Sequence, residues 1–378
     1  MSSIRTDEST LTHSRAALPN EARAASRWND SGLIGCAIAG LLFLGFALSV
    51  DFPKAAYGFQ SDEATYYTLA HSLARDFDFE FRRKDLVRVW EEFSTGPEGI
   101  FLKKGKKLQL QRKDTFPYFE LLKLPDPRTD RLYFGKSYIY PLFAAPLVWL
   151  FGTNGFLVLH AVLMTLNLAA AYAFLARRTS QASAIAYALV FFFASAVPVY
   201  FVWLTPDFFN VSLVLYAFFL WIYKEAVPRP TSDEPVVRGF RAFLRSPSSD
   251  YAAALVLGVA TFSKPIHVVL ILPLLLHAAL GRRWRHGITI GTIFGLVVAG
   301  LFALNVAITG ELNYQGGERK TFYGRTEFPF QNKQASFETA GLGRGTDRVL
   351  VEVLFTRDAF LQVFRHNLVY FLLGRHSG

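Results

Sequence analysis

The sequence holds very little cysteine: Cys36 is the only one in 378 residues. A single cysteine excludes a disulfide or a thiolate metal site within one chain, and the position of Cys36 inside an apolar run indicates a small packing residue. The sequence also has no RNA-binding signature, although its net charge is +10. The basic residues mostly lie between apolar segments, where the positive-inside rule places them. We therefore predict no nucleic acid among the partners.

Long apolar segments, by contrast, are plentiful. The chain is 52% hydrophobic and 16% aromatic, whereas soluble domains are roughly 45–50% apolar. The excess is concentrated in blocks, and several blocks approach the ~20 residues that cross ~30 Å of hydrocarbon. This pattern predicts an all-α polytopic membrane protein that is surrounded by membrane lipids.

About seven transmembrane helices are predicted. They cover 32–50, 154–175, 182–202, 207–223, two short helices within 251–280, and 287–308. A single tilted helix over 251–280 is also long enough to cross, but it would place two basic segments on opposite sides of the membrane. The positive-inside rule favours a hairpin of two short helices. We expect the break at Pro265, because proline removes a helical hydrogen bond.

These spans divide the chain into three parts. The parts are a disordered cytoplasmic tail over 1–31, a transmembrane domain over 32–308, and an outer loop with an amphipathic segment over 309–378. A large outer loop over about 51–136 follows the first span, and we expect short helices in it. Residues 99–113 alternate in polarity around a glycine, which predicts a small β-hairpin inside this loop.

The stretch QSDEATYYTLAHSLARDF, residues 60–77, follows the first span almost directly. Ser61 suits a helix N-cap, and Asp62 and Glu63 suit the first turn, because acidic side chains complement the helix dipole. This explanation needs no function. The helical period, however, places Asp62 in line with Tyr66 on the apolar stripe. A carboxylate on the buried face near a membrane is a candidate functional group.

Two further charged residues are predicted on the same side of the membrane. Asp207 lies in the outer turn between the third and fourth spans, where it could also serve as a helix N-cap. Lys264 lies at the tip of the 251–280 hairpin. It could extend to the lipid headgroups, or it could balance the charge of an anion such as a lipid phosphate.

Together these side chains suit a reaction between a phosphate leaving group and an acceptor hydroxyl. A carboxylate can take the hydroxyl proton as a general base. A lysine or a divalent metal can balance charge on the departing phosphate. Carboxylate oxygens of this kind suit Mg²⁺ or Mn²⁺ as a cofactor.

The chain resembles the glycosyltransferase-C superfamily of integral-membrane enzymes, which includes protein O-mannosyltransferases and aminoarabinose transferases. The resemblance rests on the acidic pair after the first span, Asp62 and Glu63, which two tyrosines follow. Three further segments support it: LYFGKSYIYPLFAAPLVWLFGTNGFLVLHAVL (132–163), TPDFFN (205–210) and FSKP (262–265). Together these matches cover most of the chain from about 32 to 310.

The resemblance implies a glycosyltransferase of the inner (cell) membrane of bacterial type. Such an enzyme takes a sugar from a polyprenyl-phosphate donor and transfers it, with inversion, to a hydroxyl of a lipid, glycan or protein acceptor on the periplasmic side. It implies Asp62 as the general base, with Glu63 beside it in the catalytic site. Glu63 and Asp207 become metal or acceptor contacts, and Lys264 with Asp207 becomes the binding site of the donor phosphate.

Two alternatives stay open at this point. A multi-pass transporter or lipid flippase also places charges near an apolar groove, although such proteins more often show inverted repeats and broken helices. Members of the superfamily usually continue well beyond this length, so the sequence also fits a truncated product that lacks activity. The donor sugar and the acceptor are not encoded in any readable motif.

Overall fold

The computed structural model describes residues 30–55, 59–116, 118–125, 131–227, 239–314 and 319–323, with isolated positions between 337 and 369. The predicted tail over 1–31 lies outside the described residues except for its last two. Most of the predicted segment over 309–378 lies outside them as well.

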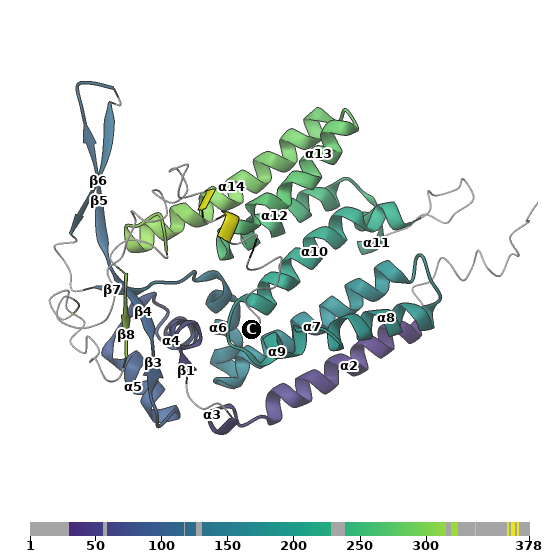
Figure 1. Ribbon diagram of the computed structural model, residues 1–378, viewed down its shortest axis with the longest axis horizontal. Coiled ribbons are helices and arrows are strands. Elements are labelled where there is room, and N and C mark those ends of the chain that lie inside the picture. The colour runs from purple at the N-terminus through teal and green to yellow at the C-terminus, as the bar shows by residue number, and fades with distance from the viewer. Residues whose placement is uncertain are drawn as a thin grey trace, which may run out of the picture.

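Four helices are long and apolar enough to cross a membrane. They are α2 (Asp30–Ser49), α7 (Asn154–Leu175), α10 (Asp207–Ala226) and α14 (Trp284–Thr309). They run in similar directions through one bundle, in which α2 packs on α7 and α7 on α10 (Figure 1). The helix α12 (Ser248–Ser263) packs between α10 and α14.

The other predicted spans are shorter or broken, so the structure has four such helices in its described part rather than seven. The segment predicted as one span over 182–202 forms two helices, α8 (Gln181–Phe193) and α9 (Val197–Val202). The short helix α6 (Ile139–Phe151) precedes α7. After α12, the chain forms a 3₁₀ helix, η1 (Pro265–Ile271), and then α13 (Leu272–Leu280).

The break predicted at Pro265 is confirmed. Lys264 has extended backbone angles between α12 and η1. The chain also reverses there, because Asp250 near the start of α12 contacts His286 near the start of α14 at 2.8 Å. A single straight helix over 251–280 would hold these two residues at opposite ends of the bundle. The hairpin prediction is therefore correct, although half of its second arm is 3₁₀ helix.

The strands lie together at one end of the bundle, which we call the sheet end; the other is the far end (Figure 1). A four-stranded antiparallel sheet has the order β2–β7–β4–β8. Its strands are β2 (Glu80–Phe81), β7 (Leu132–Phe134), β4 (Ile100–Lys104) and β8 (Arg319–Phe322). Since β8 follows α14, the chain returns to the sheet end after its last long helix, as the sequence predicts.

The remaining elements are short. They are α3 (Phe52–Ala55), α4 (Asp62–Arg75), α5 (Arg83–Glu92), α11 (Phe240–Arg245), and the strands β1 (Phe59–Gln60) and β3 (Pro97–Glu98), which pair in parallel. The predicted β-hairpin over 99–113 is wrong. Its two halves are strands, but β4 pairs with β7 and β8, while β5 (Lys106–Arg112) pairs with β6 (Phe119–Pro125). Alternation of polar and apolar residues identifies a strand but not its partner.

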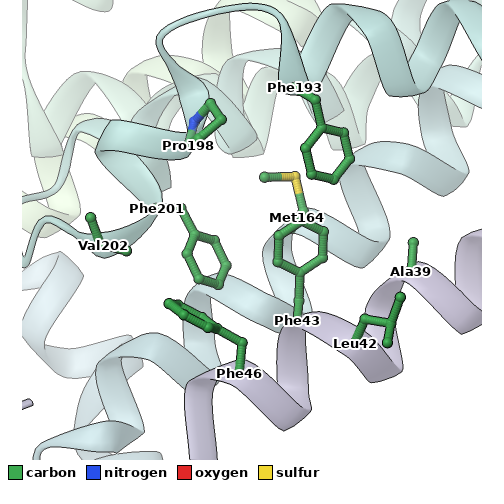
Figure 2. A pocket seen from close by; sticks show the side chains of 9 residues that line it. All are labelled: Ala39, Leu42, Phe43, Phe46, Met164, Phe193, Pro198, Phe201 and Val202. Carbon is green, nitrogen blue, oxygen red and sulfur yellow. The ribbon is translucent and has the colours of Figure 1, made fainter. Parts of the chain in front are cut away.

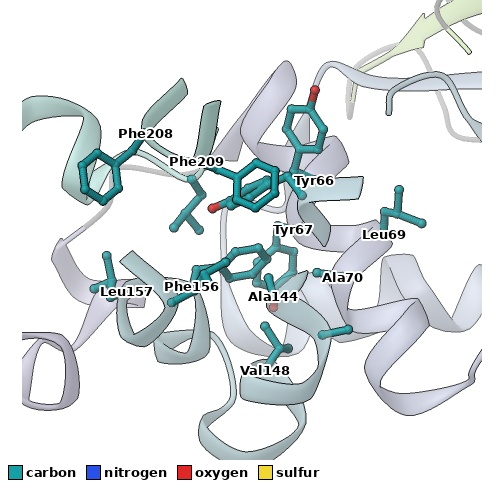
Figure 3. Close-up of a cluster of buried hydrophobic side chains, with 14 of the residues drawn as sticks. Tyr66, Tyr67, Leu69, Ala70, Ala144, Val148, Phe156, Leu157, Phe208 and Phe209 are labelled. Atoms are coloured by element: carbon teal, nitrogen blue, oxygen red, sulfur yellow. The ribbon is translucent and has the colours of Figure 1, made fainter. Parts of the chain in front are cut away.

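A cluster of buried side chains joins the loop helix α4 to the helical bundle (Figure 3). Tyr66 meets Tyr140 of α6 edge-on at 5.7 Å, and Tyr67 stacks with Phe156 of α7 at 6.4 Å. Tyr140 also contacts Phe209 of α10 at 5.8 Å. Aromatic pairs at these distances add to the hydrophobic effect. This packing fixes the start of α4 against the bundle.

Candidate functional site

Asp62 opens α4 and forms an ion pair with Lys136, with 2.6 Å between Oδ1 and Nζ. Ser61 is the N-cap residue, but its side chain makes no capping bond, and its φ is +52°. The predicted apolar stripe is present, because Tyr66 is buried. Asp62, however, keeps 43% of its side chain exposed, so the expectation that it shares the buried face is wrong. The first residue of the helix extends beyond the packed part of α4 toward Lys136.

Lys136 lies between β7 and α6 and is nearly buried, with 10% of its side chain exposed. Burial lowers its pKa, and the hydrogen bond and charge of Asp62 act in the opposite direction. Its ammonium lies 4.6 Å from the centre of the Phe101 ring, and the Arg319 guanidinium lies 4.8 Å from the same centre. Burial also lowers the pKa of Arg319. Two cations from distant parts of the chain therefore meet at one aromatic ring.

A second carboxylate–lysine pair is formed by Asp207 and Lys264. Asp207 is the first residue of α10 and accepts a hydrogen bond of 2.8 Å from the Thr205 hydroxyl. Lys264 reaches it from the break between α12 and η1. Tyr314 supports this break by donating a hydrogen bond of 3.0 Å to the Ser263 carbonyl. Both partners of the pair are partly exposed, with side-chain fractions of 41% for the lysine and 32% for the aspartate.

The two pairs lie near each other, because Glu63, next to Asp62, accepts a hydrogen bond from the N–H of Leu204, three residues before Asp207. Burial is the main cause that raises the pKa of Tyr66 well above its ordinary value, and the charges of Asp62 and Asp207 both add to it. The charge of Lys264 likewise contributes to the lowered pKa of Lys136. The Tyr66 hydroxyl points out of the aromatic cluster (Figure 3). Tyr66 therefore lies close to both Asp62 and Asp207.

Glu63 points elsewhere. Its carboxylate accepts a hydrogen bond of 3.1 Å from the Leu204 backbone N–H and another from the Trp203 side chain. Burial raises the pKa of Glu63, and these two hydrogen bonds oppose the rise. Glu63 thus fastens α4 to the turn that leads into α10, and so fixes Asp207 relative to Asp62.

The carboxylates do not form a set of metal ligands. Within the described residues no group of three or more histidine, cysteine, aspartate or glutamate side chains is close enough to hold an ion. Asp207 faces a lysine, and Glu63 faces N–H donors. These partners do not fit the predicted shared role of Glu63 and Asp207 at Mg²⁺ or Mn²⁺.

Sequence reasoning missed Lys136, Arg319 and Tyr66 as members of the site. Lys136 stands in the segment GKSYIYPL, which the family resemblance includes, so a signal for it was present. No sequence signal identified Arg319, because only the pairing of strand β8 with β4 brings its guanidinium to the Phe101 ring.

An apolar cavity of about 400 Å³ lies between helices of the bundle, and neither carboxylate–lysine pair lines it (Figure 2). It is bounded by α2, α7, α8 and α9, and its lining is Ala39, Leu42, Phe43, Phe46, Met164, Phe193, Pro198, Phe201 and Val202. Val202 directly precedes Trp203, whose side chain donates a hydrogen bond to Glu63. The cavity therefore lies next to the turn that connects α9 to Asp207.

Comparison of the chain with known protein families, with curated proteins and with solved structures finds no match.

Proposed function

We propose that the protein is a membrane glycosyltransferase that moves a sugar from a polyprenyl-phosphate donor to an acceptor hydroxyl. The observation that carries this proposal is the meeting of two carboxylate–lysine pairs, Asp62–Lys136 and Asp207–Lys264, at the sheet end of four apolar helices. A partly exposed carboxylate beside several cations suits a reaction between a neutral hydroxyl and a phosphate leaving group.

In this mechanism Asp62 is the general base. It takes the proton from the acceptor hydroxyl, whose oxygen attacks the anomeric carbon of the sugar. The bond from that carbon to the phosphate oxygen breaks, and the phosphate leaves with the electron pair. Attack opposite the leaving group inverts the anomeric centre. Lys136 holds the Asp62 carboxylate in place through their ion pair.

The cations of the site accept the phosphate. Lys264 comes from the helix break and Arg319 from β8. A phosphate that binds Lys264 competes with Asp207 for the same ammonium. The adjacent apolar cavity is within the roughly 300–1,000 Å³ range of small-molecule sites, and we propose that it takes part of the polyprenyl chain.

The charge distribution supports an orientation. Arg177 and Arg178 follow α7, and Lys224 ends α10, so these basic residues lie at the far end. The positive-inside rule assigns this end to the cytoplasm. We therefore propose a multi-pass protein of the inner membrane whose site faces the periplasm. The predicted cytoplasmic N-terminus agrees, because α2 begins at the far end (Figure 1).

A transporter or lipid flippase is the second candidate. The observation that favours it is the interruption between α12 and η1 at Lys264, since transporters place substrate at broken helices. In this chain the break lies at the sheet end, beside Asp207, rather than in the middle of the bundle. That location favours the transferase.

Native mass spectrometry of the gently purified protein tests the proposal. We expect a co-purified polyprenyl-phosphate sugar whose occupancy falls in the Lys264→Ala variant. Lys54→Ala is the matched control, because Lys54 lies on α3 with 85% of its side chain exposed. A protein that carries only bulk phospholipid would contradict the donor assignment. A bound sugar lipid that is moved across vesicles without sugar transfer would favour the flippase.

A further inference from the structure

The β5–β6 ribbon is a two-stranded sheet that projects away from the helices and from the other strands (Figure 1). Its register runs from Lys106 opposite Pro125 to Arg112 opposite Phe119. Its turn is closed by a hydrogen bond of 2.8 Å from the Lys113 N–H to the Tyr118 carbonyl. An isolated two-stranded ribbon is marginally stable in water, so an uncovered apolar surface on it calls for a partner.

The tip of this ribbon is aromatic and exposed. Phe116 is 85% exposed, Tyr118 60% and Phe119 59%. The Phe116 and Tyr118 rings pack on each other edge-on at 6.2 Å, so they form one aromatic tip rather than two separate side chains. Exposed apolar clusters of this kind mark contact sites for proteins or membranes.

One face of the ribbon continues the aromatic tip. Arg112 and Phe119 are directly opposed, and opposed residues of an antiparallel pair share a face. Leu110, two residues before Arg112, lies on that face as well and is 65% exposed. Arginine thus stands among apolar side chains. The whole segment 106–125 has five lysines and arginines against two acidic residues, a net charge of +3.

The base of the ribbon is fastened to the sheet end of α14. Lys106 forms an ion pair of 2.9 Å with Glu311, just past that helix. Gly310 approaches so closely that a Cβ there would lie 1.8 Å from the Lys106 carbonyl oxygen. α14 is one of the four helices long and apolar enough to cross a membrane, and only 11% of its most apolar window is buried. The ribbon therefore starts where this lipid-facing helix ends, and it rises on the α14 side (Figure 1).

We propose that the β5–β6 ribbon is a membrane-contacting arm. Its aromatic tip enters the headgroup region of the bilayer that holds the helices, and Arg112 on the same face contacts anionic lipid headgroups. Aromatic and basic side chains together are typical of membrane interfaces, and each basic residue near an anionic surface adds to the attraction. The strands, at ~3.3 Å per residue, are long enough to reach the surface from the end of α14. This inference requires the membrane placement of α14 but not the proposed sugar transfer.

Spin-label accessibility in the full chain tests the proposal. The single native cysteine is replaced (Cys36→Ala), and a nitroxide is attached at Thr115→Cys, which leaves the three aromatic residues of the tip in place. Glu91→Cys on α5 is the matched control, because this position is exposed but is not on the ribbon. Both proteins are reconstituted in nanodiscs of phosphatidylcholine and phosphatidylglycerol in equal parts. Collision with oxygen and with a water-soluble nickel complex is then measured.

We expect the oxygen-to-nickel collision ratio to be several-fold higher at residue 115 than at residue 91. It should fall toward the control value in discs of phosphatidylcholine alone, and also in the Arg112→Gln variant. Equal ratios at the two positions would overturn the proposal, and an unchanged ratio without anionic lipid would overturn the role of Arg112. Dipolar broadening between labels on two copies would assign the ribbon to self-association instead.

Discussion

The two ends of the helical bundle both place carboxylates beside cations, but they do so differently. At the far end, Asp250 of α12 joins Lys224 of α10 to His286 of α14, and only 4% of the aspartate side chain is exposed. Ser249 also accepts a hydrogen bond of 3.0 Å from Lys224. At the sheet end, Asp62 keeps 43% of its side chain exposed. One cluster is closed and the other is open.

This difference separates a structural role from a chemical one. Every charged group of the far-end cluster is directed at another group of the same cluster, and the cluster connects three helices. Replacing one member of a buried ion pair lowers the free energy of unfolding strongly, because the remaining charge stays buried without its partner. The sheet-end pairs can exchange their partners for a ligand. The degree of exposure, rather than the presence of charge, identifies the candidate site.

The largest expected effect concerns Asp62. Replacing it by asparagine removes the general base, so sugar transfer should fall by about 10²–10⁴-fold, the usual contribution of such a group. Some loss of stability is also expected, because the nearly buried Lys136 loses its ion-pair partner, so transfer is compared under conditions in which the variant is still folded. Transfer kinetics and chemical unfolding in mixed micelles check both parts. Asp51→Asn, at an exposed aspartate just after α2, is the control that should keep its activity; an active Asp62→Asn protein would end the general-base proposal.

For Asp250 we expect the main effect on stability rather than on sugar transfer. Asp250→Asn leaves the Lys224 ammonium buried without its counter-charge, so the free energy of unfolding should fall by about 3–5 kcal/mol. Asp207→Asn breaks a partly exposed pair and should cost at most about 1 kcal/mol. Unfolding of both variants in the same micelles gives the comparison. Equal losses would mean that the open and closed clusters do not differ as described.

A smaller effect is expected at Glu63, which supports the site without facing the ligand. Glu63→Ala leaves the Leu204 N–H and the Trp203 side chain without their acceptor, at a cost of about 1–3 kcal/mol in the free energy of unfolding. Glu63→Gln keeps an acceptor oxygen and should lose less. If alanine and glutamine cost the same, the hydrogen bonds to Glu63 do not hold the turn.

The smallest effect concerns pH and His71, in the loop helix α4. Burial lowers the pKa of His71 to about 3, and the charges of Arg75 and Arg88 add to this. In the unfolded chain His71 takes up a proton as the pH falls through 6.5, whereas in the folded protein it does so only near pH 3. The contribution of His71 to stability should therefore fall below pH 6.5, by about 1.4 kcal/mol one unit lower. Asp85, whose pKa burial raises to about 7, contributes in the opposite direction, so the wild type is compared with a His71 variant. Unfolding curves at the two pH values check this, and His71→Gln should remove that part of the slope.

Some of the site could be predicted from local sequence. The acidic start of α4 follows from the helical period and the dipole, and the break at Lys264 follows from Pro265. The sequence correctly predicts Asp207 at the same end of the bundle as Asp62. Each successive span takes the chain to the opposite side of the membrane, so the number of spans between two turns decides whether they lie on the same side. The burial of Asp62 was predicted wrongly. The helical period identifies which residues share a face of α4, but it does not show that neighbouring elements leave the first residue of that face uncovered.

The sequence by itself determined the four apolar helices, the short loop helix with its two acidic residues, and the proline break. Each of these depends on neighbours within one or two helical turns. Only the tertiary structure decided that β4 pairs with β8 rather than β5, that Lys136 meets Asp62, and that Glu63 turns to Leu204. These contacts join distant segments, and many alternative partners have the same local pattern. The physical choice among them is made by packing and by the satisfaction of buried polar groups, which exist only in the folded chain.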